Sequence, residues 1–263
     1  MVMVGATRFF SIMGVCLGVT FVLAYSLQWL SRYVRVVGIT HVGGKIYWYF
    51  VSPGIACHET GHAVGCWLTG QRVLKFVPFC PNNGDTLGYV RHTVGPGWWG
   101  AVSNMVIATG PIWFGCLVIV LVTWLLSAEE LTVRFTEFFP DADMPNVVSY
   151  VCGCAQAAIG LAVDTLVSLV REGWKAILWF YLVFCIASEI GLSSVDLSHI
   201  WKGVMIVVAV LGVLSCVPVV GHAIFAVVYV FLPKLFLVHV FMMFALVVNI
   251  IVMCAMKCLP CRR

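Results

Sequence analysis

The segment His58-Glu59-Thr60-Gly61-His62 contains the residues of this chain that are best suited to metal chemistry. In a helix, side chains four positions apart lie on the same face, one turn from each other. The His58 and His62 imidazoles can therefore reach one zinc ion, while the Glu59 carboxylate can accept a proton from a water molecule on that ion. The spacing predicts a hydrolytic zinc site with Glu59 as its catalytic residue and one Zn²⁺ per chain.

The overall composition places this motif inside a membrane. Hydrophobic residues make up 62% of the 263 residues and charged residues only 10%, whereas about 25% of the residues of a soluble domain are charged. The net charge of +4 comes mostly from scattered residues, so no basic patch indicates a nucleic-acid partner. We therefore expect a multi-pass protein embedded in the lipid bilayer.

Seven apolar runs predict an all-α polytopic membrane protein, with about six transmembrane helices and a small β-hairpin after the zinc-binding helix. The run 146–170 carries Gln156 and Asp164, so we expect it not to cross, and a seventh span is the alternative. A small excess of basic residues on one side favours cytoplasmic termini. We treat residues 1–263 as a single domain. The runs cover residues 9–30, 47–69, 99–126, 146–170, 174–192, 204–232 and 235–257.

The zinc-binding helix has recognisable start and stop signals. Ser52 is a good N-cap, Pro53 suits the first helical position and Gly70 is a typical stop, so we expect a helix from Pro53 to Thr69. Such a helix places both histidines within the hydrocarbon depth of the bilayer. A hairpin is expected next, because residues 72–79 and 87–94 have strand composition and flank Asn83-Gly84-Asp85.

A catalytic zinc site needs a third protein ligand. Asp196 is the favoured candidate, because it directly follows the apolar run 174–192 and because Ser193 or Ser194 could orient its carboxylate. Asp196 could instead cap a helix, and Glu189 or Asp164 could be the ligand. The residues of suitable type near membrane depth are Asp164, Glu189, Asp196, His199 and His222.

The zinc helix and its surroundings resemble the site-2 protease family of intramembrane zinc metalloproteases. The resemblance implies a protease-like core at about 46–203, Asp196 as the third zinc ligand and a membrane-spanning protein as substrate. Residues 188–197 depart from the family, since they lack its Asn-Pro residues and the glycine after the aspartate. The matching segments are Ser52-Pro53-Gly54, His58 to His62, Leu68-Thr69-Gly70, Gly88-Tyr89-Val90 and Ala108-Thr109-Gly110-Pro111.

Outside this core, the resemblance leaves additional transmembrane helices at 9–30, 204–232 and 235–257. The hairpin could hold an unwound substrate by strand addition, or it could be an ordinary connection. Water must reach the site through a polar cleft, for which Ser103, Asn104 and Thr109 are candidates. A regulatory membrane partner or a homo-oligomer is compatible with this class of protein.

Two other functions use the same residue types. A multi-spanning protease of the prenyl-protein-processing kind pairs H-E-x-x-H with a downstream glutamate, which would be Glu189 here. A metal transporter would line an ion path with histidines and carboxylates, usually from two facing helices. Near the C-terminus, Cys254, Cys258 and Cys261 lie beside Lys257 and could be palmitoylated, form part of a metal site or remain free thiols.

Overall fold

The computed structural model describes residues 2–81, 87–126, 147–171 and 173–258. Within these ranges the fold is mostly helical with one two-stranded antiparallel hairpin, as the composition and the Asn-Gly step predict. The elements are α1 (Val2–His41), α2 (Gly44–Leu68), β1 (Val73–Val77), β2 (Tyr89–His92), α3 (Gly97–Ala108), α4 (Gly110–Leu126), α6 (Val147–Arg171), α7 (Trp174–Glu189), α8 (Ser194–Ser215) and α9 (Pro218–Lys257).

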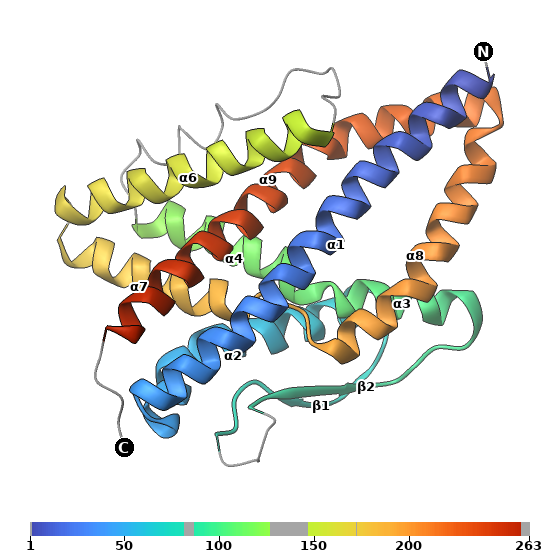
Figure 1. Ribbon diagram of the computed structural model, residues 1–263. Helices are drawn as coiled ribbons and strands as arrows, with labels where there is room; N and C mark the ends of the chain where they lie inside the picture. Colours follow the sequence, from blue (N-terminus) through green and yellow to red (C-terminus); the bar gives the residue numbers. More distant parts are fainter. Residues whose placement is uncertain (1, 82–86, 127–146, 172, 259–263) are drawn as a thin grey trace.

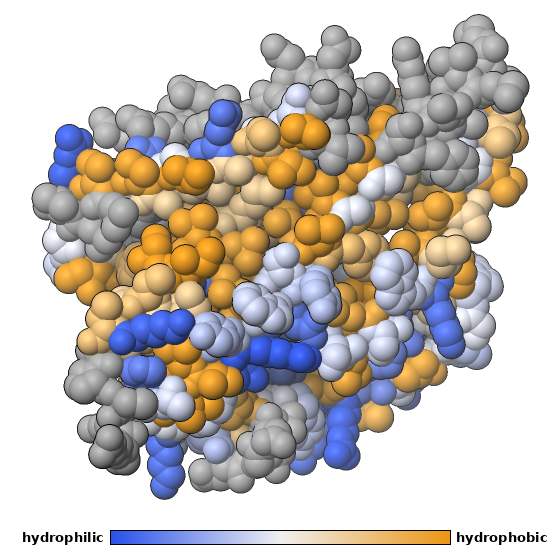
Figure 2. All heavy atoms as spheres, viewed as in Figure 1, coloured by the Kyte–Doolittle hydropathy of each residue, from blue (hydrophilic) through white to orange (hydrophobic). Residues whose placement is uncertain are grey.

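Four stretches of the described helices are long and apolar enough to cross a membrane. They are Ile12–His41 of α1, Gly97–Leu126 across α3 and α4, Ser194–Ser215 of α8 and Leu235–Lys257 of α9. Figure 2 shows a largely apolar face, with hydrophilic side chains gathered in its lower part, on the side of the hairpin. The chain is therefore a helical protein of membrane-embedded character.

Two predicted helix boundaries differ from the structure. The run 9–30 is part of α1, which continues to His41, and the run 204–232 is divided between α8 and α9. The division follows from Pro218, which occupies the first turn of α9 and disfavours helical geometry at Val217. Cys254 and Cys258 are exposed in the last turns of α9, while the acidic stretch 127–145 and Cys261 lie outside the described residues.

Helix α2, which carries the two histidines expected to bind zinc, begins at Gly44, so the expected N-cap at Ser52 is wrong. Pro53 lies inside the helix and cannot donate to the carbonyl of Tyr49, four residues earlier. The Ser52 hydroxyl donates to that carbonyl instead, at 2.8 Å. The carbonyl of Phe50 accepts a further bond from the Tyr181 hydroxyl of α7, at 2.9 Å. These bonds allow a proline in mid-helix, and α2 ends as predicted, before Gly70 in the left-handed region (φ +71°).

The helices form one bundle in which α2 occupies the middle. α1 and α9 run side by side, α2 packs between α4 and α7, and α3 packs on α8 (Figure 1). The hydrophobic core gathers side chains from all these helices, of which α3 contributes Ala108 and α8 contributes Ile200 and Val204. Among the almost fully buried side chains are Leu27, Val34, Val51, Phe241 and Phe244. The helix that carries the H-E-x-x-H sequence therefore packs against several other helices of the bundle.

A polar chain of hydrogen bonds joins α1, α6 and α9 within this core. The Thr20 hydroxyl donates to the carbonyl of Cys16 at 2.7 Å, so its oxygen is left to accept from Nε2 of the buried His239, also at 2.7 Å. The Tyr150 hydroxyl then donates to Nδ1 of His239, at 2.8 Å. A neutral His239 satisfies all three side chains, which removes the cost of burying them.

Two glycines bring the backbones of α2 and α4 into contact. A Cβ atom on Gly61 would lie 2.8 Å from the carbonyl carbon of Gly110, and a Cβ on Gly110 would in turn collide with the carbonyl of Gly61. Only glycine fits at both positions. The contact brings the adjacent end of α3 close to His62.

We predict opposite effects of the same substitution at two helical glycines. Gly61→Ala should lower the thermal unfolding midpoint of detergent-purified protein, because overpacking costs about 1–3 kcal/mol. Gly18→Ala is the matched control: nothing lies within 4 Å of its Cβ position, and alanine favours the helix by about 0.5–1 kcal/mol. Equal midpoints for the two variants would contradict the close α2–α4 contact.

The hairpin follows α2 with an irregular register. β1 and β2 pair Lys75 with Arg91, Phe76 with Val90 and Val77 with Tyr89, with a register shift between Val73 and Lys75. Lys75 and Arg91 both lie over the Tyr89 ring, at 5.4 and 5.5 Å from its centroid. The turn at Asn83-Gly84-Asp85 lies outside the described residues. The predicted hairpin is confirmed.

Candidate metal centre

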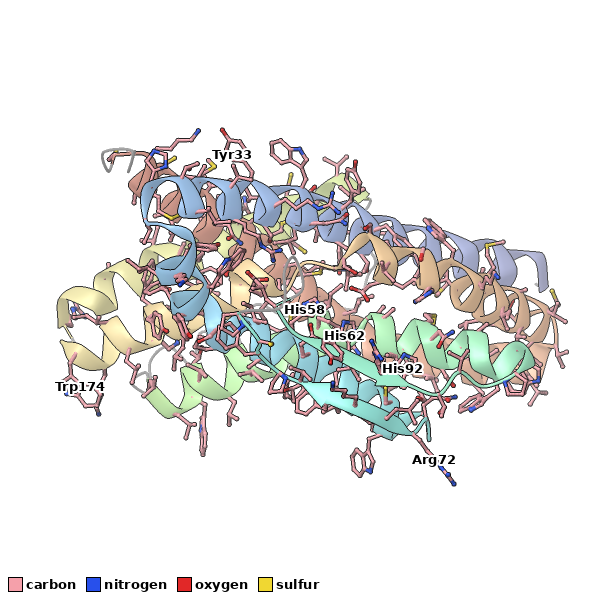
Figure 3. All side chains as sticks on the ribbon, turned by 90° about the horizontal axis from the view of Figure 1, so that it is seen from below. Tyr33, His58, His62, Arg72, His92 and Trp174 are labelled. Carbon is pink, nitrogen blue, oxygen red and sulfur yellow. The ribbon has the colours of Figure 1, made fainter. Side chains whose placement is uncertain are left out.

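The two histidines of α2 point their Nε2 atoms at each other. Nδ1 of His58 lies 2.7 Å from the backbone carbonyl of Glu189, and Nδ1 of His62 lies 2.8 Å from that of Ile107. A carbonyl oxygen can only accept, so each Nδ1 carries the proton and each neutral ring has a lone pair on Nε2. The two Nε2 atoms are 3.2 Å apart. Figure 3 shows the two rings next to each other between α1 and the hairpin.

Both carbonyls lie at helix ends, where the regular bond from the residue four positions later is missing. Ile107 lies in the last turn of α3, and the residue four positions later is Pro111, which has no N–H to donate. Glu189 is the last residue of α7, where helix carbonyls lack an intrahelical partner. The ends of two helices therefore orient the two imidazoles, as carbonyls that accept from the far nitrogen of a ligating histidine do in metal sites.

Asp196 supplies the third group. Its Oδ1 lies 3.5 Å from Nε2 of His62, and its Oδ2 lies 4.0 Å from Nε2 of His58. Asp196 also closes a capping box at the start of α8: Ser193 N–H donates to Oδ2 at 2.8 Å, and Asp196 N–H donates to the Ser193 hydroxyl at 3.1 Å. Asp196 thus caps the helix and faces the histidines at once, with Ser193 orienting it.

His58, His62 and Asp196 form a group that could hold a metal ion, since one ligand atom from each lies within 4.8 Å of the others. With both rings neutral, two imidazole lone pairs and a carboxylate converge here, which is a donor set suited to a metal cation. Tetrahedral bonds of about 2.0–2.1 Å would place two nitrogens about 3.3 Å apart. The observed 3.2 Å fits that spacing.

The other candidate ligands lie elsewhere. The Glu189 carboxylate accepts from the Arg35 guanidinium at 2.8 Å. Glu189 therefore contributes to the site through its backbone carbonyl, which accepts from Nδ1 of His58. Asp164 of α6 does not line the cavity beside the histidines, whereas His199 does. The side chain of His222 lies outside the described residues.

A cavity of about 520 Å³ opens beside the three groups. Of the residues expected to line a water path, Asn104 lies on its wall. Ser103 is fully buried elsewhere, and the Thr109 hydroxyl donates to the carbonyl of Met105 in its own helix, at 2.9 Å. The wall combines side chains from α1, α2, α3, the hairpin and the α7–α8 connection.

Glu59 faces this cavity and is held against the hairpin. A Cβ atom on Gly88 would lie 2.7 Å from Cγ of Glu59, so a glycine at this position lets the start of β2 cover the glutamate. Among the residues that the structure describes, none forms a hydrogen bond or ion pair with the Glu59 carboxylate. The carboxylate is therefore free to exchange a proton with a molecule in the cavity.

Sequence reasoning missed the contribution of α1. Arg35 lies beyond the apolar run 9–30, yet it belongs to α1 and pairs with Glu189. The signal in the sequence is the helical spacing of Gln28, Ser31, Arg32 and Arg35, which indicates that the helix continues beyond residue 30.

Comparisons with known proteins found no matching protein-family model, no matching curated protein and no matching solved structure.

We predict that bound metal depends on the three converging side chains. His58→Ala, His62→Ala and Asp196→Ala should each reduce the metal content of purified protein, measured by mass spectrometry, from about one ion per chain to a small fraction of that. Asp164→Asn is the matched control, since its carboxylate does not line the cavity. Full metal content in the Asp196→Ala protein would show that Asp196 is not a metal ligand.

Arg35 should stabilise the site through Glu189. Arg35→Met leaves the buried Glu189 carboxylate without its partner, which should lower both the thermal midpoint and the metal affinity, the latter by about 10- to 100-fold. The double variant Arg35→Met with Glu189→Gln buries no unpaired charge and should recover part of the loss, with a coupling of about 1–3 kcal/mol. Strictly additive effects would show that the ion pair does not support the site.

Proposed function

We propose that this chain is an intramembrane zinc metalloprotease of the site-2 protease type, which hydrolyses peptide bonds of membrane-spanning substrates. The observation that carries the proposal is the convergence of His58 Nε2, His62 Nε2 and Asp196 on one point beside the free carboxylate of Glu59. Three protein ligands with an open position are typical of catalytic zinc, whereas structural zinc sites have four.

In the proposed hydrolysis, Glu59 transfers the proton, and two backbone carbonyls orient the histidines that would hold zinc. Zinc, when bound, supplies Lewis-acid polarisation of the scissile carbonyl and acidifies water. Glu59 takes the proton of the attacking water and delivers it to the leaving amine. The carbonyls of Glu189 and Ile107 keep each Nδ1 protonated and so keep each Nε2 directed at the ion.

β2 is suited to hold the substrate in extended form. Leu87, Gly88, Tyr89, Val90 and His92 line the cavity, and no residue of β1 does. Among the described residues β2 pairs only with β1, which leaves its other edge available for strand addition. A helical substrate that unwinds here would expose its peptide carbonyls beside Glu59.

The same proposal covers the membrane topology. We infer that α2 and α7 add spans to the four long apolar stretches and that α6 does not cross. The expected placement of both termini on the cytoplasmic side does not fit this arrangement. α1 and α9 run parallel, with Thr20 bonded to His239 and Tyr33 to Lys257, so the start of α1 and the end of α9 lie at opposite ends of the bundle (Figure 1). The support for α2 and α7 is that they pack against each other and that both contribute side chains to the hydrophobic core. The ion pair between Glu189 and Arg35 argues against a prenyl-protein-processing protease, which would need that glutamate on zinc.

Glu59→Gln provides the test of the mechanism. In proteoliposomes with a panel of single-span peptides, the variant should cleave about 10²- to 10⁴-fold more slowly, because general acid–base catalysis contributes about that much. Its zinc content should equal that of the wild type, so that only the proton transfer is lost. Cleavage would be followed by mass spectrometry of the products.

Removal of the metal is the complementary test. A zinc chelator should abolish cleavage by the wild type, and added Zn²⁺ should restore it. Unimpaired cleavage by Glu59→Gln, or by fully metal-depleted protein, would refute the proposed mechanism. Uptake of zinc into sealed vesicles that depends on His58 would favour a transporter instead.

A further inference from the structure

Helix α1 presents a polar stripe to the metal cavity. Gln28, Ser31, Arg32 and Arg35 follow the i, i+3, i+4, i+7 spacing of one helix face, and all four line the cavity. They lie within the long apolar stretch Ile12–His41. Polar and charged groups in such a stretch are costly, and they commonly mark a functional path.

The two arginines of the stripe are in different situations. Arg35 is neutralised by Glu189 at 2.8 Å. Arg32 has no carboxylate within ion-pair distance among the residues that the structure describes. Gln28, oriented with its amide oxygen toward α8, accepts from Arg32 Nη2 and from the backbone N–H of Ser194, each at 3.0 Å. Gln28 thereby holds the Arg32 guanidinium beside the start of the helix that carries Asp196.

The charge around the cavity is balanced except at Arg32. A divalent ion would offset the two carboxylates of Glu59 and Asp196, and Arg35 offsets Glu189. The remaining lining residues with ionisable side chains are His92, His199 and Tyr89, which bring no further carboxylate to the cavity. With the metal bound, one positive charge is left, and it lies on α1.

The stripe also contains two buried hydrogen-bond donors without an acceptor among the described residues. The hydroxyl of Ser31 and the Nε of Arg35 are buried and have no partner among the described residues. Unpartnered buried donors of this kind are uncommon in proteins and call for an explanation. An anion beside Arg32 would supply an acceptor at the same helix face.

We propose that Arg32 and the polar stripe of α1 form a subsite for one carboxylate of the substrate. The inference rests on the proposed proteolytic function and narrows its substrates to peptides with an aspartate or glutamate side chain, or a free C-terminal carboxylate, near the scissile bond. A single carboxylate matches the single uncompensated charge, and the planar guanidinium fork binds carboxylates in two-point fashion. Arg32 is then a specificity-determining residue.

The binding test separates this subsite from catalysis. Fluorescent single-span peptides, each with one aspartate placed at a different position around the centre, are titrated in detergent micelles against zinc-loaded Glu59→Gln protein. At one or two positions the aspartate peptide should bind about 10- to 100-fold more tightly than its asparagine counterpart, the size of one charge-assisted hydrogen-bonded pair. A C-terminally amidated set distinguishes a side-chain carboxylate from a terminal one.

Variants of Arg32 complete the test. Arg32→Gln should abolish the preference for aspartate while binding of the asparagine peptides stays unchanged, and Arg32→Glu should favour lysine at the same position. Arg171→Gln is the control, because Arg171 is exposed at the end of α6 and does not line the cavity. Equal affinities for aspartate and asparagine peptides, or a preference that survives Arg32→Gln, would overturn the subsite. If the wild-type protein cleaves none of the peptides while the preference for the aspartate peptide persists, only the proposed protease function is refuted.

Discussion

Two imidazole nitrogens and a carboxylate face one another beside the central cavity of this protein, and that arrangement is suited to hold a positive charge between them. Because the N–H of each ring is donated to a backbone carbonyl, the 3.2 Å between the two Nε2 atoms separates lone pairs rather than a donor from an acceptor. Their mutual repulsion in a medium of low dielectric constant is relieved by a cation. The surrounding helices are arranged so as to hold these groups in place.

The restraints on the site come from places where helices end or are interrupted. Pro111 leaves the carbonyl of Ile107 for His62, the end of α7 leaves that of Glu189 for His58, and the first turn of α8 fixes Asp196. In an apolar bundle every such freed group needs a partner. The hydrogen bonds that orient the groups of the candidate metal centre are therefore the same bonds that satisfy the helix ends.

Helix α1 is part of the candidate site and not an addition to the predicted core. A protease-like core at about 46–203 would leave α1 as an addition, yet Arg35 pairs with Glu189 and Gln28 reaches Ser194. Both contacts act on residues 189–196, which include Asp196 and the Glu189 carbonyl that accepts from Nδ1 of His58. We infer that α1 belongs to the site in structure and, through Arg32, in substrate recognition.

The sequence alone determined the helical membrane character, the hairpin and the two histidines with their intervening glutamate, since all of these depend on spacing over a few residues. It left three acidic residues open as the third ligand and misplaced the starts of α2 and α9. Only the tertiary structure decided that Asp196 faces the histidines and that Glu189 is held by Arg35, 154 positions away in the chain. Such pairings depend on how distant helices cross, and local periodicity carries no information about that.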